Sequence, residues 1–84
     1  MPSAAEFKQE LDAEIDRAIR QGRPHLEVNA GELHRRVGGY PGNHRMPVCC
    51  NVMREEAERG DAATIFDTNS GDGAALTIRY VIPR

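Results

Sequence analysis

The chain has 84 residues, 39% of them hydrophobic, and a formal net charge of −2. This length suits a single domain over residues 1–84 with a modest core, and no apolar run is long enough to span a membrane. The N-terminus lacks the pattern of a signal peptide, and the two cysteines are adjacent, where a disulfide would be strained. We therefore expect a cytoplasmic protein with reduced thiols.

The first predicted element is a helix that starts at the N-terminal end of the chain. Ser3 and Glu6 form the S-x-x-E pattern of a capping box, which satisfies backbone amides at a helix start. Gly22, followed by Arg23 and Pro24, ends the helix. Apolar residues recur between these limits at the three-to-four spacing of one buried face: Phe7, Leu11, Ile15, Ala18 and Ile19.

A short strand and a second helix are predicted next. Apolar residues alternate over 25–28, which is typical of a strand. Asn29 is placed to cap the following helix, with Glu32 three residues later. This helix ends at Gly38-Gly39, and its apolar residues are Ala30, Leu33 and Val37.

A third helix and a hairpin complete the predicted elements. The helix begins near Asn43 or just before Pro47, since proline is tolerated in the first turn, and Gly60 closes it. Its inner face consists of Val48 or Cys49, followed by Val52, Met53 and Ala57. Two strands, 63–66 and 75–82, flank a segment rich in turn-forming residues, 69–73, which indicates a hairpin.

The predicted order is helix, strand, helix, helix, strand, strand, which places the chain in the α+β class. This order resembles the winged helix-turn-helix family over nearly the whole chain, although no diagnostic motif accompanies it. Residues 28–34 and 37–47 are also similar to short bacterial proteins of unassigned function, a likeness that assigns no role to any residue. We expect one contiguous core built from Leu11, Ile15, Ile19, Leu33, Val37, Val52, Met53, Phe66, Leu76 and Ile78.

Charge is distributed unevenly along the chain. Five acids and one lysine give residues 1–16 a net charge of −4, and six acids and three arginines give residues 55–84 a net charge of −3. Residues 17–54 carry +5, and every positive charge there comes from an arginine. Arginine suits two-point contacts with phosphate and guanine. We expect Arg35, Arg36, Arg45 and Arg54 to converge on one surface.

The winged-helix resemblance implies binding to double-stranded DNA, as a transcriptional regulator or a DNA-binding accessory protein. In that family the third helix enters the major groove and the hairpin touches the flanking backbone or minor groove. The matching groove-facing residues here are His44, Arg45, Asn51 and Arg54, with Cys50 and Glu55 at the margin. Arg35 and Arg36 would contact phosphates, and Asn69 and Ser70 would lie at the tip of the wing.

Other functions remain open on the sequence alone. His34, His44, Cys49 and Cys50 are metal-ligand types, but their spacing is poor for zinc, and no third group completes a cysteine nucleophile with His44. We expect no metal, no cofactor and no enzymatic activity. The leading alternatives are a winged-helix module for protein–protein contact and an accessory subunit of a restriction or mobile-element assembly, with homodimerisation compatible with either.

Overall fold

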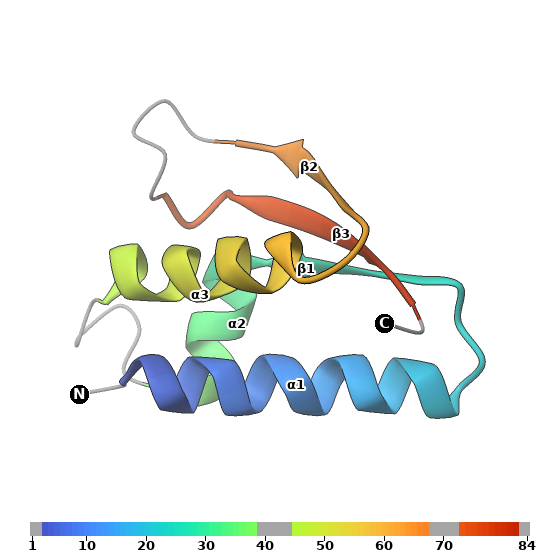
Figure 1. Ribbon diagram of the computed structural model, residues 1–84. Coiled ribbons are helices and arrows are strands. Elements are labelled where there is room, and N and C mark those ends of the chain that lie inside the picture. The colour runs from blue at the N-terminus through green and yellow to red at the C-terminus, as the bar shows by residue number, and fades with distance from the viewer. Residues whose placement is uncertain (1–2, 39–44, 68–72, 83–84) are drawn as a thin grey trace.

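A computed structural model describes residues 3–38, 45–67 and 73–82 of the chain. Within these residues the elements, in chain order, are α1 (Ala4–Arg20), β1 (His25–Asn29), α2 (Ala30–Val37), α3 (Met46–Glu58), β2 (Ala62–Phe66) and β3 (Thr77–Val81). In Figure 1 the sheet lies along one side of α3, and α1 runs along the other side. The predicted α+β class is confirmed.

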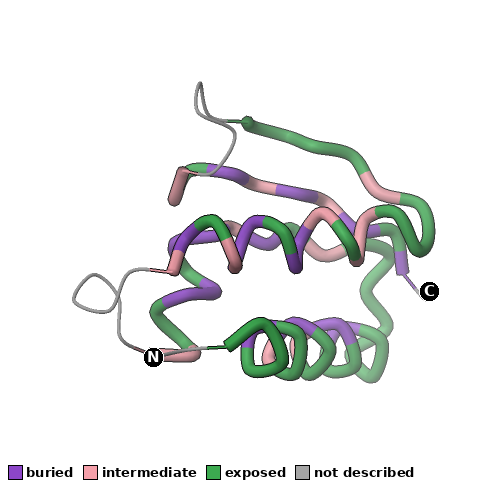
Figure 2. The backbone as a smooth tube through the Cα atoms, turned by 60° about the vertical axis from the view of Figure 1, so that its left-hand side comes forward, coloured by how far each residue is buried: buried purple, intermediate pink, exposed green. Residues whose placement is uncertain are grey.

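The strands form one antiparallel sheet in the order β1-β3-β2. β3 is the central strand, and its Ile78 and Tyr80 side chains are buried, whereas Thr77, Arg79 and Val81 alternate with them. Because successive side chains of a strand point to opposite faces, one face of the sheet packs on the helices and the other faces outward. Figure 2 shows this alternation of burial along β3.

One hydrophobic core joins all three helices to the sheet. Seven of the predicted core residues are buried: Leu11, Ile15, Leu33, Val52, Met53, Leu76 and Ile78. Val37 is partly buried against them. The predicted core did not include Tyr80, which among the described residues is the largest fully buried side chain and whose hydroxyl donates a hydrogen bond to the backbone oxygen of Met53 at 2.8 Å.

Two predicted core residues are exposed instead. Ile19 is 39% exposed. Residues four apart on a helix are rotated by about 40° from each other around its axis. Three such steps separate Phe7 from Ile19, so Ile19 lies beyond the edge of the buried face of α1. Phe66 is 56% exposed. The register of β2 shifts between Thr64 and Phe66, so that Phe66 pairs with Thr77 on the outward face of the sheet.

The predicted helix limits follow from local hydrogen bonds. Ser3 and Glu6 form the expected capping box at the start of α1. Asn29 caps α2 by accepting a hydrogen bond from the Glu32 backbone amide at 3.1 Å. Gly22 follows the last turn of α1 with a positive φ of 72°, which an L-residue adopts at a cost. None of the helices within the described residues is long and apolar enough to cross a membrane.

Candidate interaction surfaces

Three of the arginines predicted to contact DNA lie beside carboxylates. Arg35 is 3.3 Å from Glu32, within α2. The Arg36 guanidinium is 3.8 Å from Glu14, on α1. Arg54 is 3.3 Å from Asp67, just after β2. The Arg36 pair therefore joins α2 to α1, whereas the Arg54 pair joins α3 to the sheet, on the side of α3 away from α1 (Figure 1).

These ion pairs reduce the positive potential that the arginine-rich segment was expected to create. Exposed pairs contribute only about 0–1 kcal/mol each, so a phosphate could compete for the same guanidinium groups. The carboxylates would nevertheless repel that phosphate. The pairing therefore weakens the main sequence argument for DNA binding, which was a convergent and unneutralised arginine surface.

The outer side of α3 carries little positive charge. Its exposed residues are Pro47, Asn51, Glu55 and Glu58, so the stripe changes from uncharged to acidic along the helix. Asn51 is exposed as predicted. The interpretation of Cys50 as a marginal groove-facing residue is wrong, because Cys50 is fully buried in the core.

The structure gives Arg45 and His34 a shared structural role. The backbone amide of Arg45, at the N-cap of α3, donates a hydrogen bond to Nε2 of His34 at 2.9 Å. His34 is fully buried, with its ring edge-on to Phe7 at a centroid distance of 4.9 Å. Nε2 can accept this bond only when it carries no proton. His44, Asn69 and Ser70, the other predicted contact residues, lie outside the described residues.

Both cysteines pack as small hydrophobic residues. The Cys49 thiol approaches the backbone oxygen of Ala30 at 3.5 Å, and the Cys50 thiol approaches that of Gly73 at 3.6 Å. Burial, with a smaller effect of Cys50, raises the pKa of Cys49 to about 12, so this side chain is a thiol and not a nucleophilic thiolate at neutral pH. Within residues 3–38, 45–67 and 73–82, no group of three or more potential ligands is placed to hold a metal ion.

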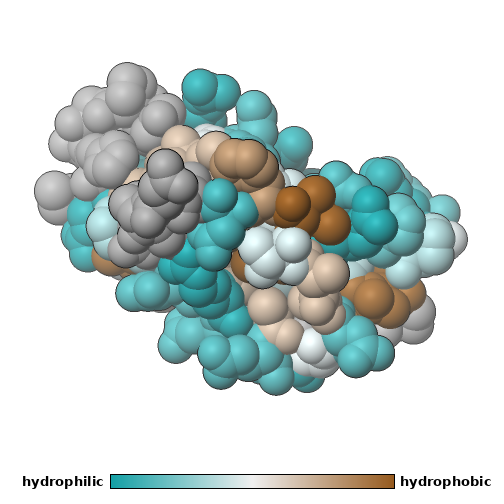
Figure 3. All heavy atoms as spheres, turned by 90° about the horizontal axis from the view of Figure 1, so that it is seen from above, coloured by the Kyte–Doolittle hydropathy of each residue, from teal (hydrophilic) through white to brown (hydrophobic). Residues whose placement is uncertain are grey.

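The outward face of the sheet carries an apolar surface that was not predicted from the sequence. Ile65 and Val81 are each 47% exposed, and Phe66 is still more exposed. Figure 3, which looks down on this side, shows brown apolar groups among the teal polar ones. Residues 62–66 include no charged residue. They also do not alternate between apolar and polar types, and this was the sign in the sequence that apolar side chains could lie on the outward face.

β2, which carries two of these apolar residues, lies at the edge of the sheet. It pairs with β3 on one side, and within the described parts of the chain no strand pairs with its other edge. An edge strand without charge or proline presents backbone groups to which another extended segment can bind. The bulge at Ile65 limits how regularly such a segment can pair.

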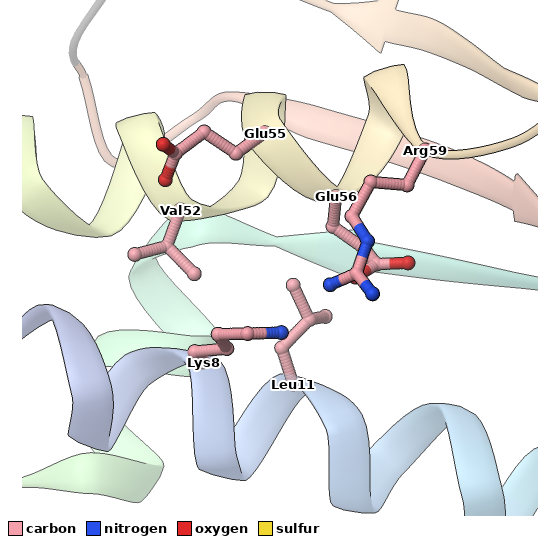
Figure 4. A pocket seen from close by; sticks show the side chains of 6 residues that line it. All are labelled: Lys8, Leu11, Val52, Glu55, Glu56 and Arg59. Carbon is pink, nitrogen blue, oxygen red and sulfur yellow. The ribbon is translucent and has the colours of Figure 1, made fainter.

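A groove of about 290 Å³ separates α1 from α3. Leu11 and Val52 form its apolar floor, and charged side chains project around it in Figure 4. Lys8 pairs with Asp12 at 3.3 Å and Arg59 with Glu56 at 3.6 Å. Two basic residues, Lys8 and Arg59, and two acidic residues, Glu55 and Glu56, line the groove, so its lining carries no net charge.

The chain matches none of the protein-family models, curated proteins and solved structures with which it was compared. No residue therefore takes a role from a relative.

Proposed function

We propose that this chain is a winged-helix-like domain that binds another protein through the edge of β2. The observation that carries the proposal is the exposure of Ile65 and Phe66 on a strand whose outer edge is open within the described residues. Complete burial of a side chain of this kind contributes about 1.5–3 kcal/mol. A partner strand that covers both residues would recover that free energy and add main-chain hydrogen bonds.

The charges around β2 indicate the chemistry of the partner. Glu58 and Asp61 precede the strand, and Arg59 between them pairs with Glu56 at 3.6 Å. Asp67 follows the strand and pairs with Arg54 at 3.3 Å. An extended partner segment with an apolar centre and a basic residue near the start of β2 would complement this arrangement. A second copy of the chain fits less well, because antiparallel pairing of two β2 strands about Thr64 would place Asp61 opposite Asp67 of the other copy.

DNA binding is the second candidate, and one observation favours it. Asn51 is exposed on α3, the helix that reads the major groove in the winged-helix family, and an asparagine amide can make paired hydrogen bonds to adenine. The acidic Glu55 and Glu58 would confine such contacts to the first half of α3. A regulator, or an accessory subunit of a DNA-processing assembly, would be consistent with this candidate.

Site-specific photo-crosslinking distinguishes the two candidates. A photoreactive residue is placed at position 66 in one variant and at position 51 in another, and each is expressed in the cells that produce the protein. We expect position 66 to crosslink to one discrete protein, and excess unlabelled wild type to suppress the crosslink. The Phe66→Glu protein serves as the matched competitor that fails to suppress it.

The opposite pattern would contradict the proposal. Crosslinking of position 51 to DNA, with no discrete protein at position 66, would favour the DNA-binding candidate. Equal competition by wild type and Phe66→Glu would show that any captured protein is not held by the β2 edge.

A further inference from the structure

The hydrogen bonds between β2 and β3 show which backbone groups of β2 point away from the sheet. The Val81 amide donates to the Asp61 oxygen at 3.0 Å, so these two residues form a hydrogen-bonded pair of the antiparallel ladder. Such pairs alternate with pairs that exchange no hydrogen bond. In this register Ala63 belongs to the next hydrogen-bonded pair. The N–H and C=O groups of Ala62 and Thr64 therefore point toward the open edge.

The hydrogen bonds on the other side of β3 give the same assignment. The Ile82 amide donates to the Pro24 oxygen at 3.0 Å. The Ala30 amide, at the start of α2, donates to the Leu76 oxygen at 2.8 Å. Because successive residues of a strand direct their backbone groups to opposite edges, the even-numbered residues of β3 bond toward β1. The odd-numbered residues, Arg79 among them, bond toward β2, which lies on the opposite side of β3 (Figure 1).

The outward face beside this edge accommodates a large side chain. Ala63 and Ile65 are both exposed there. A segment that binds the backbone of Ala62 and Thr64 brings its middle residue opposite Ala63, on the outward face. Ala63 is small, and diagonal neighbours in a sheet lie about 7–8 Å apart, within reach of long side chains. A large apolar side chain at the middle position would therefore cover Ala63 and reach Ile65.

The two ends of β2 differ in charge. Glu58, the last residue of α3, and Asp61 lie near the start of the strand. Arg59 between them pairs with Glu56 at 3.6 Å. Asp67, at the other end, pairs with an arginine at 3.3 Å. Among the described residues, negative charge is thus concentrated at the start of β2, which favours a basic residue of the partner there.

We propose that the partner of β2 is an extended protein segment whose main chain pairs with Ala62 and Thr64. Its middle residue carries a large apolar side chain opposite Ala63, and a basic residue lies beside the start of β2. The pairing is short, because the bulge at Ile65 interrupts the regular edge after Thr64. This inference rests on the proposed binding of a protein at β2 and specifies the backbone groups that hold that protein.

Hydrogen exchange of the free, full chain, followed by NMR, tests the backbone assignment. The Ala62 and Thr64 amides point to solvent, so they should exchange at close to the rate of an unstructured peptide. The Ala63 amide donates into the sheet and should exchange at least about tenfold more slowly. Equal exchange of the Ala63 and Thr64 amides would overturn the inference.

Thr64→Pro tests the main-chain pairing, with Thr64→Ala as its matched control. Both variants lose the hydroxyl, but only proline lacks the N–H group. As an unlabelled competitor of the crosslink from position 66, Thr64→Pro should be about tenfold to a hundredfold weaker than wild type, as loss of an interfacial hydrogen bond predicts. Thr64→Ala should compete within about twofold of wild type, as an exposed substitution does.

A second variant keeps the test decisive if thermal melts show that Thr64→Pro unfolds. The full chain is made by chemical ligation with an ester in place of the Thr64 amide. The ester removes the same N–H donor but keeps the threonine side chain and adds no ring. It should compete as weakly as a folded Thr64→Pro. An ester variant that competes as well as wild type would contradict the inference.

The competition separates this inference from the proposed function. If wild type suppresses the crosslink and Phe66→Glu does not, while Thr64→Pro and Thr64→Ala compete equally, β2 binds a protein but not through main-chain pairing. The inference then fails and the proposed function stands. If position 66 captures no discrete protein, both fail. Capture of a second copy of this chain, or of a helical segment of another protein, would also overturn the inference.

Discussion

At the scale of single residues, His34 connects the start of α3 to the core. Its ring lies between Phe7 and the Arg45 backbone, so one buried side chain holds α2, α1 and α3 in register. In the sequence, His34 is one of several residues that could be read as a metal ligand. The structure instead makes it a hydrogen-bond acceptor in a sealed interior.

Replacement of this ring by one without an acceptor is the first prediction. His34→Phe keeps an aromatic ring but removes the acceptor of the hydrogen bond from the partly buried Arg45 amide, and leaving such an amide unsatisfied costs up to about 1–3 kcal/mol. Urea unfolding should show a loss of stability of that size. His25→Phe is the control, since His25 is exposed on β1. Equal stability of His34→Phe and wild type would contradict a structural role for the hydrogen bond.

Glu14 leads to a prediction about pH. Burial raises the pKa of its carboxyl group above the ordinary value of 4.5, so the folded state holds this proton to higher pH than the unfolded state. Its contribution to stability is present below pH 4.5 and is lost as the pH rises through the folded-state pKa. In phosphate-free buffer, the free energy of unfolding of the wild type should fall relative to that of Glu14→Gln as the pH rises above 4.5 and through the folded-state pKa of Glu14. A difference between the two proteins that stays constant with pH would contradict the shift.

At the scale of the elements, the bulge in β2 decides which residues are exposed. Ala62 pairs with Tyr80 and Thr64 with Ile78, which places both on the helix side of the sheet. The shift after Thr64 then brings Phe66 opposite Thr77 on the outward face. A regular strand would have given residue 66 the same side as residue 64.

Phe66 should therefore be dispensable for folding. We expect Phe66→Ser to change the free energy of unfolding by no more than about 0.5 kcal/mol, as surface substitutions usually do. Leu76→Ser is the contrasting variant, because Leu76 is fully buried and its loss leaves a cavity with a polar group inside it. Thermal melts of the two proteins measure the difference. Strong destabilisation by Phe66→Ser would show that this ring belongs to the core.

At the scale of the whole molecule, opposite charges are interleaved. The acidic first helix and the arginine-rich middle of the chain are distinct blocks in the sequence, but Arg36 reaches Glu14 across the α1–α2 contact. Arg79 similarly meets Glu27 across β1 and β3 at 2.6 Å. Acidic and basic residues that are separated along the sequence are therefore neighbours in the folded protein.

The pairing of arginines with carboxylates leads to a prediction about binding to duplex DNA of random sequence. If β2 is the functional surface, titration against random duplex DNA at two salt concentrations should show at most weak affinity. A DNA reader would instead lose affinity steeply with added salt, and loss of one phosphate contact in Arg36→Ala would reduce the slope by about one unit. In that case Asn51→Ala should cost about 1–3 kcal/mol at a preferred sequence alone. Such a result would replace the protein-binding proposal.

The sequence by itself determined the types of the elements and many of their ends. Ser3, Asn29 and Gly22 act on backbone groups within a few residues of themselves, so their effects can be read locally. The α+β class follows from the same short-range patterns. Tertiary structure alone decided the side of the sheet on which Phe66 lies, the burial of His34 and the partners of the arginines. Each of these depends on residues far away in the chain, such as Thr77 for Phe66 and Glu14 for Arg36, and a local pattern holds no information about which distant group will arrive there.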